Sequence, residues 1–155
     1  MSILAIDPGA SGGLAWVDRD GNVQCQAMPD TEGDLRDAIR SVLAQAPPTP
    51  TAYLEDAPCF IGGKGHGNAL VKLNRRAGLI EGMLLIAGFR LVRVRPQTWQ
   101  KPLGVGKRRD CATDSEWKNK LKAEAQRRFP HADVTLKTAD SLLILDYACR
   151  QEALR

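Results

Sequence analysis

A single acidic residue near the start of the chain separates a short apolar run from a glycine-rich turn. Residues 2–6 have the apolar character of a buried strand, Asp7 ends that strand, and a Pro-Gly-Ala-Ser-Gly-Gly segment leads into a second apolar run at 14–17. Glycines favour a tight turn, so the two runs are expected to pair as a hairpin. A carboxylate held where a buried strand meets such a turn faces a cleft, which is where a divalent-metal ligand must lie.

Two further acids stand at comparable positions. Glu55, followed by Asp56, ends the strand-like run 51–54, and Asp140 opens a helical pattern near the C-terminus. A helical segment precedes the strand that ends at Glu55, and a right-handed crossover would lay this strand parallel to the one that ends at Asp7. Acids also occur at strand ends simply because strands end at the surface. Jointly, however, Asp7, Glu55 and Asp140 indicate one metal site.

The spacing of apolar residues predicts an α/β fold with a five-stranded mixed sheet. Short apolar runs predict strands at 3–7, 13–17, 23–28, 51–55 and 89–95. Spacings of three and four predict helices that begin near Asp30 or Thr31, Asn68, Thr113 and Thr138. In the second of these helices, burial is expected for the whole stripe Leu70, Leu73, Ala77, Ile80 and Leu84, while the glycine-rich segment 57–67 is expected to be a loop.

Length and cysteine usage limit the possible classes of protein. The 155 residues suffice for a single domain over 1–155, and no apolar run approaches the roughly 20 residues of a membrane span. The four cysteines are far apart and form no Cys-x-x-Cys pair, which fits free thiols in a reducing compartment better than a zinc site. No leader-like segment opens the chain. We therefore expect a soluble, cytoplasmic protein with no membrane contact.

Basic residues gather in one part of the chain. The net charge is +4, whereas residues 90–128 contain 12 Lys and Arg against 4 Asp and Glu. Such a stretch is often just a solvated face. Because the same chain has acids that are expected to bind a metal, the basic stretch also fits a surface that binds a polyanion such as DNA.

Four segments resemble the signature segments of RuvC-like Holliday-junction resolvases, a family with the ribonuclease H-like fold, and they are most similar to the short forms carried by bacteriophages. The segments are Ile6-Asp7-Pro8-Gly9 with Ser11-Gly12-Gly13, Leu54-Glu55-Asp56, Ala77-Gly78 with Glu81-Gly82, and Ala139-Asp140-Ser141-Leu142-Leu143-Ile144. The resemblance extends from end to end. It implies an endonuclease that acts as a homodimer on four-way DNA and makes paired, symmetric nicks.

The resemblance also implies a cofactor. Asp7, Glu55 and Asp140 would hold Mg²⁺, with two ions at the site and Mn²⁺ able to substitute. From the residues themselves, Gly78 and Gly82 allow a second helix to approach the helix around Leu70–Leu84 closely, either from within the chain or from a partner subunit, and we expect the dimer to form there. Lys137 departs from the family pattern, because relatives carry an acid or a histidine there and a protonated lysine cannot bind Mg²⁺.

Three explanations of Lys137 stay open. The site has three carboxylates, or it borrows Asp133 or Asp56, or Lys137 contacts the scissile phosphate. We favour three acids with Lys137 as a catalytic phosphate contact, although a plain surface lysine fits equally well.

Several residues are candidates for contacts with DNA: Phe60, Lys64, Lys101, Lys107, Arg108, Arg109 and Lys118. The basic ones would contact phosphates, and Lys118 resembles the basic residue that the family carries on the following helix. Phe60 would enter the unpaired centre of a junction, as an aromatic residue near this place does in relatives, although core packing is an equal alternative.

Two other functions share the same acids. One is a ribonuclease H-like nuclease for flaps, forks or RNA–DNA hybrids, and the other is a junction-binding protein without catalysis, which Lys137 would explain. A phosphate-binding domain of the sugar-kinase type also begins with an acid before a glycine turn, but it needs two lobes and this chain is too short for them.

Overall fold

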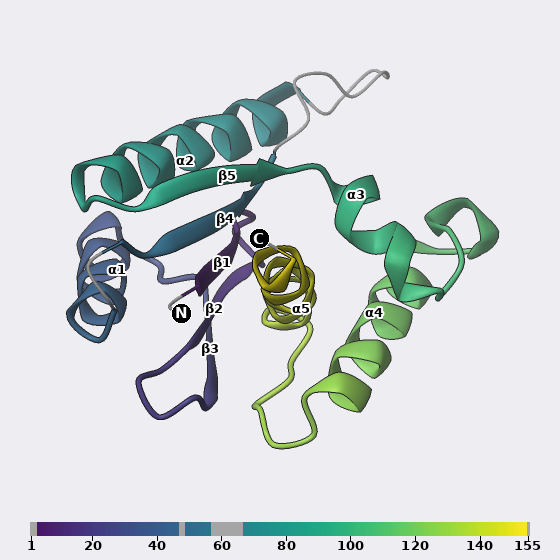
Figure 1. Cartoon of the computed structure of the whole chain (residues 1–155). Coiled ribbons are helices and arrows are strands. Elements are labelled where there is room, and N and C mark those ends of the chain that lie inside the picture. Colours follow the sequence, from purple (N-terminus) through teal and green to yellow (C-terminus); the bar gives the residue numbers. More distant parts are fainter. Residues whose placement is uncertain (1–2, 47–48, 57–66, 155) are drawn as a thin grey trace.

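Five strands form one mixed sheet in the computed structural model, which describes residues 3–46, 49–56 and 67–154. The strands are β1 (Ile3–Asp7), β2 (Gly13–Val17), β3 (Val23–Ala27), β4 (Thr51–Glu55) and β5 (Arg90–Val94). Their order is β3-β2-β1-β4-β5; the first three are antiparallel, and β4 and β5 run parallel to β1 (Figure 1). This confirms the predicted five-stranded mixed sheet and the predicted crossover.

Helices cover both faces of this sheet. They are α1 (Glu32–Ala44), α2 (Gly67–Ile86), the short α3 (Pro96–Gln100), α4 (Asp114–Arg128) and α5 (Ala139–Ala153), with 3-10 turns η1 (Lys101–Leu103) and η2 (Arg108–Asp110) before α4. The four long helices lie where the sequence predicts them. None of the helices in the described ranges combines the length and apolar character that crossing a bilayer requires.

Helix α3 was not predicted. The chain leaves β5 at Arg95, and Pro96 occupies the first helical turn, where its missing N–H costs nothing. At the start of α4 the Thr113 hydroxyl accepts the Glu116 N–H, and the Glu116 carboxylate accepts from the Ala112 N–H.

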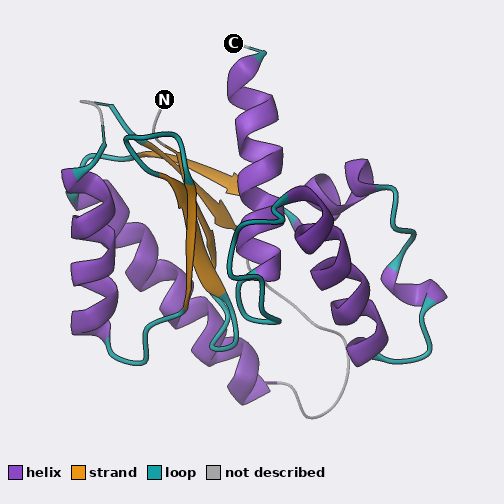
Figure 2. Cartoon of the chain, turned by 90° about the horizontal axis from the view of Figure 1, so that it is seen from below, coloured by secondary structure: helices purple, strands orange, loops and turns teal. Residues whose placement is uncertain are grey.

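Alternation along the strands divides the core into two layers, one on each face of the sheet, and Figure 2 shows the helices that cover these two faces. Leu4, Ile6 and Leu54 face α1 and α2. The intervening residues face α3, α4 and α5; among them are Ile3, Ala5 and Tyr53. Continuing the alternation by one step places Asp7 and Glu55 on the side of α5.

Helix α2 is less buried than predicted. Ile80 and Leu84 are fully buried, but Leu70, Leu73 and Ala77 are only partly covered, so the predicted burial of the whole stripe is wrong for its first three positions. Val71, in the same half of the helix, is 67% exposed. The half of α2 nearer its N-terminus therefore presents an apolar surface.

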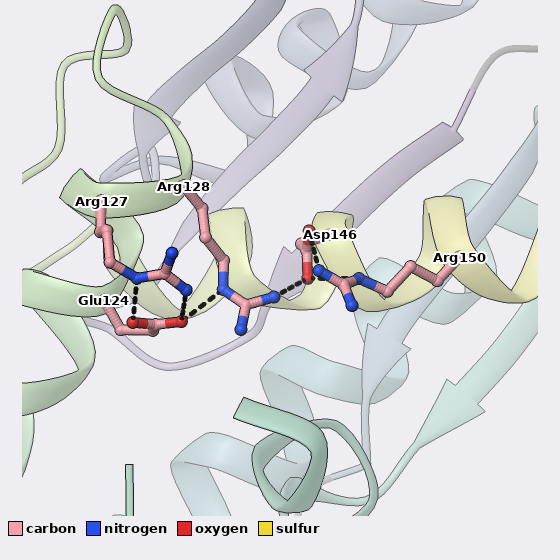
Figure 3. Close-up of polar contacts among 5 residues, drawn as sticks. All are labelled: Glu124, Arg127, Arg128, Asp146 and Arg150. Atoms are coloured by element: carbon pink, nitrogen blue, oxygen red, sulfur yellow. Dashed lines mark hydrogen bonds and ion pairs between the residues drawn. The ribbon is translucent and has the colours of Figure 1, made fainter. Parts of the chain in front are cut away.

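Helix α5 lies between the sheet and α4, and a chain of ion pairs fastens it to α4 (Figure 3). Arg128 of α4 is only 11% exposed and donates to Glu124 of its own helix and to Asp146 of α5. Arg127 and Arg150 complete the network at its two ends. Hydrogen bonds, first from Arg127 and then from Arg128, lower the pKa of Glu124 to about 2.

Cys25, Cys111 and Cys149 are free thiols, as predicted, and Cys59 lies outside the described residues.

The α4–α5 network gives a prediction about stability. Arg128→Met keeps the aliphatic stem but removes the buried bridge, and it is expected to lower the free energy of unfolding by about 1–3 kcal/mol. Arg127→Met removes an exposed arginine from the same Glu124 and is expected to cost less than about 1 kcal/mol. Urea denaturation of the two variants measures both values, and equal costs would contradict the assignment of the bridge to Arg128.

Candidate active site

Parallel pairing brings Asp7 and Glu55 to the same edge of the sheet. Ile6 lies opposite Leu54, so the next residue of each strand is an acid at its C-terminal end. Asp140 lies in the first turn of α5, which packs across β1 and β2. The three acids come from three elements far apart in the sequence, and the fold gathers them on one face.

The charges of these acids act on one another. Burial raises the pKa of Asp7, and it raises that of Glu55 well above its usual value, with further contributions from the charges of Asp7 and Asp140. Burial, followed by the charge of Asp7, raises the pKa of Asp140 to about 7. The ammonium of Lys118 on α4 works in the opposite direction at all three acids. The site is therefore a partly buried acidic triad whose negative charge Lys118 offsets only in part.

The β1–β2 turn sets the position of Asp7. The Gly9 N–H donates to Asp7 Oδ1 at 2.9 Å, and the Gly12 N–H donates to the Gly9 carbonyl at 2.9 Å. A Cβ on Gly12 would lie 2.4 Å from the Asp7 carbonyl oxygen and 2.5 Å from its carboxyl carbon. Glycine is required at position 12 because the turn folds directly onto the carboxylate.

The next glycine sets the position of Asp140. A Cβ on Gly13 would lie 2.8 Å from the Lys137 carbonyl oxygen and 2.7 Å from that of Gln26. The turn before α5 thus rests against the backbone of β2, three residues ahead of Asp140. The Ser-Gly-Gly segment of the sequence thereby locates two of the three acids.

The backbones of the two alternative ligands, Asp56 and Asp133, are held by hydrogen bonds outside the triad. The Asp56 N–H donates to the Val94 carbonyl, and the Asp56 carboxylate lies 4.0 Å from Arg95 Nε. Asp133 accepts a hydrogen bond from the Thr138 hydroxyl through its carbonyl. Lys137 is exposed in the turn before α5, and its backbone N–H donates to the Thr135 hydroxyl.

The donor set fits a hard divalent cation, because carboxylate oxygens are the ligands that Mg²⁺ prefers and a cation would relieve the repulsion among three partly buried acids. Asp7, Glu55 and Asp140 are the residues that could hold it. Across the described ranges, no three His, Cys, Asp or Glu side chains are drawn together closely enough to enclose an ion. The structure thus shows interacting carboxyls rather than a closed coordination shell.

The predicted DNA-contact residues fall into three groups. Lys118, on α4, is near enough for its charge to lower the pKa of all three acids. Lys101, Lys107 and Arg109 are exposed on the segment between α3 and α4, whereas the guanidinium of Arg108 pairs with Asp114 and donates to the Cys111 carbonyl. Phe60 and Lys64 lie outside the described residues.

A cleft of about 770 Å³ adjoins the β1–β2 turn and was not predicted. Pro8 to Ser11 form one part of its wall, the acidic start of α1 forms another, and α2 contributes Lys72, Arg75 and Arg76. These cations stand at i, i+3 and i+4, a spacing that puts them on one face of a helix, so the sequence did contain the signal. The three cations were not predicted as a binding surface because they lie outside the basic stretch at 90–128.

Trp99 was also missed as a site residue. Its side chain in α3 is fully buried and acts to lower the pKa of Glu55, against the effect of burial. Its position depends on α3, which was not predicted.

The chain has the fold of known RuvC structures. Thermus thermophilus RuvC in complex with a Holliday junction substrate superposes with a TM-score of 0.60 and 16% sequence identity, over 97% of this chain and 96% of that one. A second Thermus thermophilus RuvC structure gives 0.59 and 16%, over 98% and 97%. This confirms the ribonuclease H-like fold that the resemblance implied. No protein-family model and no curated protein sequence matches the chain.

Substitution of Gly12 tests how the turn holds Asp7. Gly12→Ala is expected to lower the free energy of unfolding by at least about 2 kcal/mol, because the added Cβ overlaps backbone and carboxylate atoms that cannot both move away. Gly33→Ala, whose Cβ would meet nothing closer than 3.8 Å in α1, is expected to stabilise by about 0.5 kcal/mol. Urea unfolding of both variants measures the difference, and a neutral Gly12→Ala would contradict the close approach.

The raised pKa of Asp140 predicts a pH dependence of stability without metal. The folded protein keeps a proton on Asp140 up to a pH of about 7, whereas the unfolded chain loses it near 3.8. The stability linked to this proton is complete below about pH 4 and is lost as the pH rises through 7. Asp140→Asn avoids this loss and is expected to be more stable than the native protein at pH 8, by on the order of 2 kcal/mol.

The two proteins should have similar stability at pH 4, where Asp140 is neutral. Urea unfolding in the presence of a chelator at pH 4, 6 and 8 measures the difference, and a difference that does not change with pH would contradict the raised pKa.

Proposed function

We propose that this chain is a metal-dependent endonuclease that cleaves branched DNA, with the four-way junction as its substrate and residues 1–155 as a single nuclease domain. The observation that carries the proposal is the partly buried triad Asp7, Glu55 and Asp140, whose charges act on one another on a RuvC-like fold. A RuvC of that fold is described in complex with a Holliday junction, which supports the choice of substrate.

In this proposal the three carboxylates hold Mg²⁺, with two ions at the site and Mn²⁺ able to substitute. When bound, the ions supply a Lewis acid that activates the attacking water and stabilises the departing oxygen of the phosphodiester. The protein contributes a fixed set of oxygens: the Gly9 N–H orients Asp7, the β1–β4 pairing orients Glu55, and the first turn of α5 carries Asp140.

Two lysines complete the proposed site. Lys118 already acts on all three acids, so its ammonium lies where it offsets negative charge as the phosphate arrives. Lys137 precedes Asp140 by one helical turn and is exposed, which suits a contact with the scissile phosphate.

Contacts with the DNA backbone are proposed for two surfaces. One is the basic segment before α4 with Lys101, Lys107, Arg108 and Arg109. The other is the cleft beside the β1–β2 turn with Lys72, Arg75 and Arg76. Lys64 would add a phosphate contact, and Phe60 would enter the junction centre. Each phosphate contact adds about 0.9 to the slope of binding affinity against salt concentration on a double-logarithmic scale.

A homodimer through α2 is proposed because the half of this helix nearer its N-terminus leaves apolar side chains uncovered. Leu70 and Leu73 are only partly buried and Val71 is 67% exposed. A Cβ on Gly78 would meet nothing within 4 Å, so a second helix has room to approach closely there. Two copies supply two sites, as paired nicks require. The free thiols fit a cytoplasmic location, and assignment to the bacteriophage type remains a hypothesis from sequence.

The test is cleavage of a four-way DNA junction by purified protein with and without Mg²⁺. We expect Mg²⁺-dependent paired nicks. Asp7→Asn removes one negative charge from the triad and is expected to lower the nicking rate at least roughly 10²-fold while junction binding persists. Asp37→Asn, which alters an exposed acid of α1 paired with Arg36, serves as the matched control and is expected to nick normally.

Each other outcome has a distinct meaning. Cutting without metal, or an active Asp7→Asn protein, would contradict the proposed site. Single cuts near a branch point would indicate a nuclease for flaps or forks that acts as a monomer. Tight binding with no nicking at any Mg²⁺ concentration would indicate a junction-binding protein without catalysis.

A further inference from the structure

The indole N–H of Trp99 is buried without a hydrogen-bond partner among the described residues. The side chain is 1% exposed, and its Nε1 atom is shielded from solvent. Leaving a buried donor unsatisfied typically costs about 1–3 kcal/mol. Phenylalanine or leucine would fill a core position without that cost, so the presence of an indole here needs an explanation.

The fold places this indole beside Glu55. Glu55 ends β4 directly opposite Val94, the last residue of β5, and α3 begins two residues later at Pro96. Trp99 packs in the same core layer as Tyr53 and Val94, the layer that continues to the acidic triad. The indole N–H is thus near the Glu55 carboxyl without the geometry of a full hydrogen bond, and it opposes the rise in the pKa of Glu55 that burial causes.

The chemistry of the two groups is complementary. An indole N–H is a donor only, so it stabilises the ionised carboxylate and gains nothing from an apolar neighbour. Glutamate has one more rotatable bond than aspartate, and Glu55 therefore needs more restraint than Asp7 or Asp140. An indole held rigidly in a core supplies such restraint, in the way that outer hydrogen bonds orient metal-binding side chains.

We propose that Trp99 is a positioning residue for Glu55, whose indole N–H directs the carboxylate toward Asp7 and Asp140 and completes its hydrogen bond when the site takes up a divalent cation. This inference rests on the proposed function. It explains why a short helix follows β5 and why a buried donor is tolerated at its centre.

The chain contains a matched control. Trp16 of β2 also has a buried Nε1 without a partner among the described residues. It packs against the core layer of α1 and α2, on the opposite face of the sheet from the triad. Removing the N–H at position 16 is therefore the same chemical change as at position 99, but it is made on the face of the sheet that does not carry the carboxyls.

The test replaces each indole in turn with benzothiophene, as β-(3-benzothienyl)alanine, which keeps the ring shape but has no N–H. Mn²⁺ affinity is measured without DNA, from the electron paramagnetic resonance signal of the free ion. We expect the replacement at position 99 to weaken Mn²⁺ binding roughly 10- to 100-fold. The replacement at position 16 should change it less than about twofold.

A second measurement reports on the hydrogen bond itself. The indole ¹H–¹⁵N signals of Trp16, Trp99 and Trp117 are assigned with single Trp→Phe variants. On addition of Mg²⁺ the Trp99 proton signal should move downfield, and Glu55→Ala should abolish that movement.

The outcomes separate the two proposals. A wild-type protein that binds no Mn²⁺ and nicks no junction overturns the proposed function, and the role of Trp99 falls with it. The positioning role alone is overturned by a different result. In that case the wild-type protein binds Mn²⁺ and nicks the junction, and the variant with benzothiophene at position 99 binds Mn²⁺ as tightly as the wild type. A Trp99 signal that does not respond to Mg²⁺ does the same.

Discussion

Repulsion among three partly buried carboxyls is the constraint around which this structure is organised. Burial raises the pKa of all three acids, and the charges of neighbouring acids raise it further at Glu55 and Asp140, so bringing them together costs free energy that a bound cation would offset. The surroundings offset part of that cost: the Gly9 N–H donates to Asp7, Lys118 brings an opposite charge, and Trp99 lies beside Glu55. Ordinary core packing needs none of these features at one sheet edge, and their coincidence is the strongest argument for a functional site.

The rest of the scaffold holds that arrangement in place. Helix α5 is covered by the sheet on one side and by α4 on the other, and Arg128 bridges the two helices through Glu124 and Asp146. Lys118 lies on the same α4, so the bridge that fastens this helix also fixes where the ammonium stands relative to Asp140. Stability and electrostatics are coupled here, because the same ion pairs serve both.

Local patterns were sufficient for much of the fold and for the acids. The five strands have apolar runs bounded by turn residues, and the crossover rule alone makes β4 parallel to β1, so the predicted proximity of Asp7 and Glu55 needed no side-chain detail. The predicted burial of the α2 stripe was wrong where burial depends on what packs against the helix. Leu70, Leu73 and Ala77 have the spacing of a buried stripe, but no described element covers them fully, and spacing cannot show what lies opposite a helix.

The sequence by itself determined which residues are acidic, which of them end strands, and that glycines follow Asp7, because chemical identity and short-range periodicity are local properties. Only the tertiary structure decided that Gly12 and Gly13 press on the backbone around Asp7 and Lys137, that α3 carries Trp99 to Glu55, and that three cations of α2 line a cleft beside the turn. Apart from the Gly12–Asp7 contact, which spans five positions, those facts depend on atoms brought together across more than 40 positions of the chain. Distances of that kind follow from packing, which no local pattern encodes.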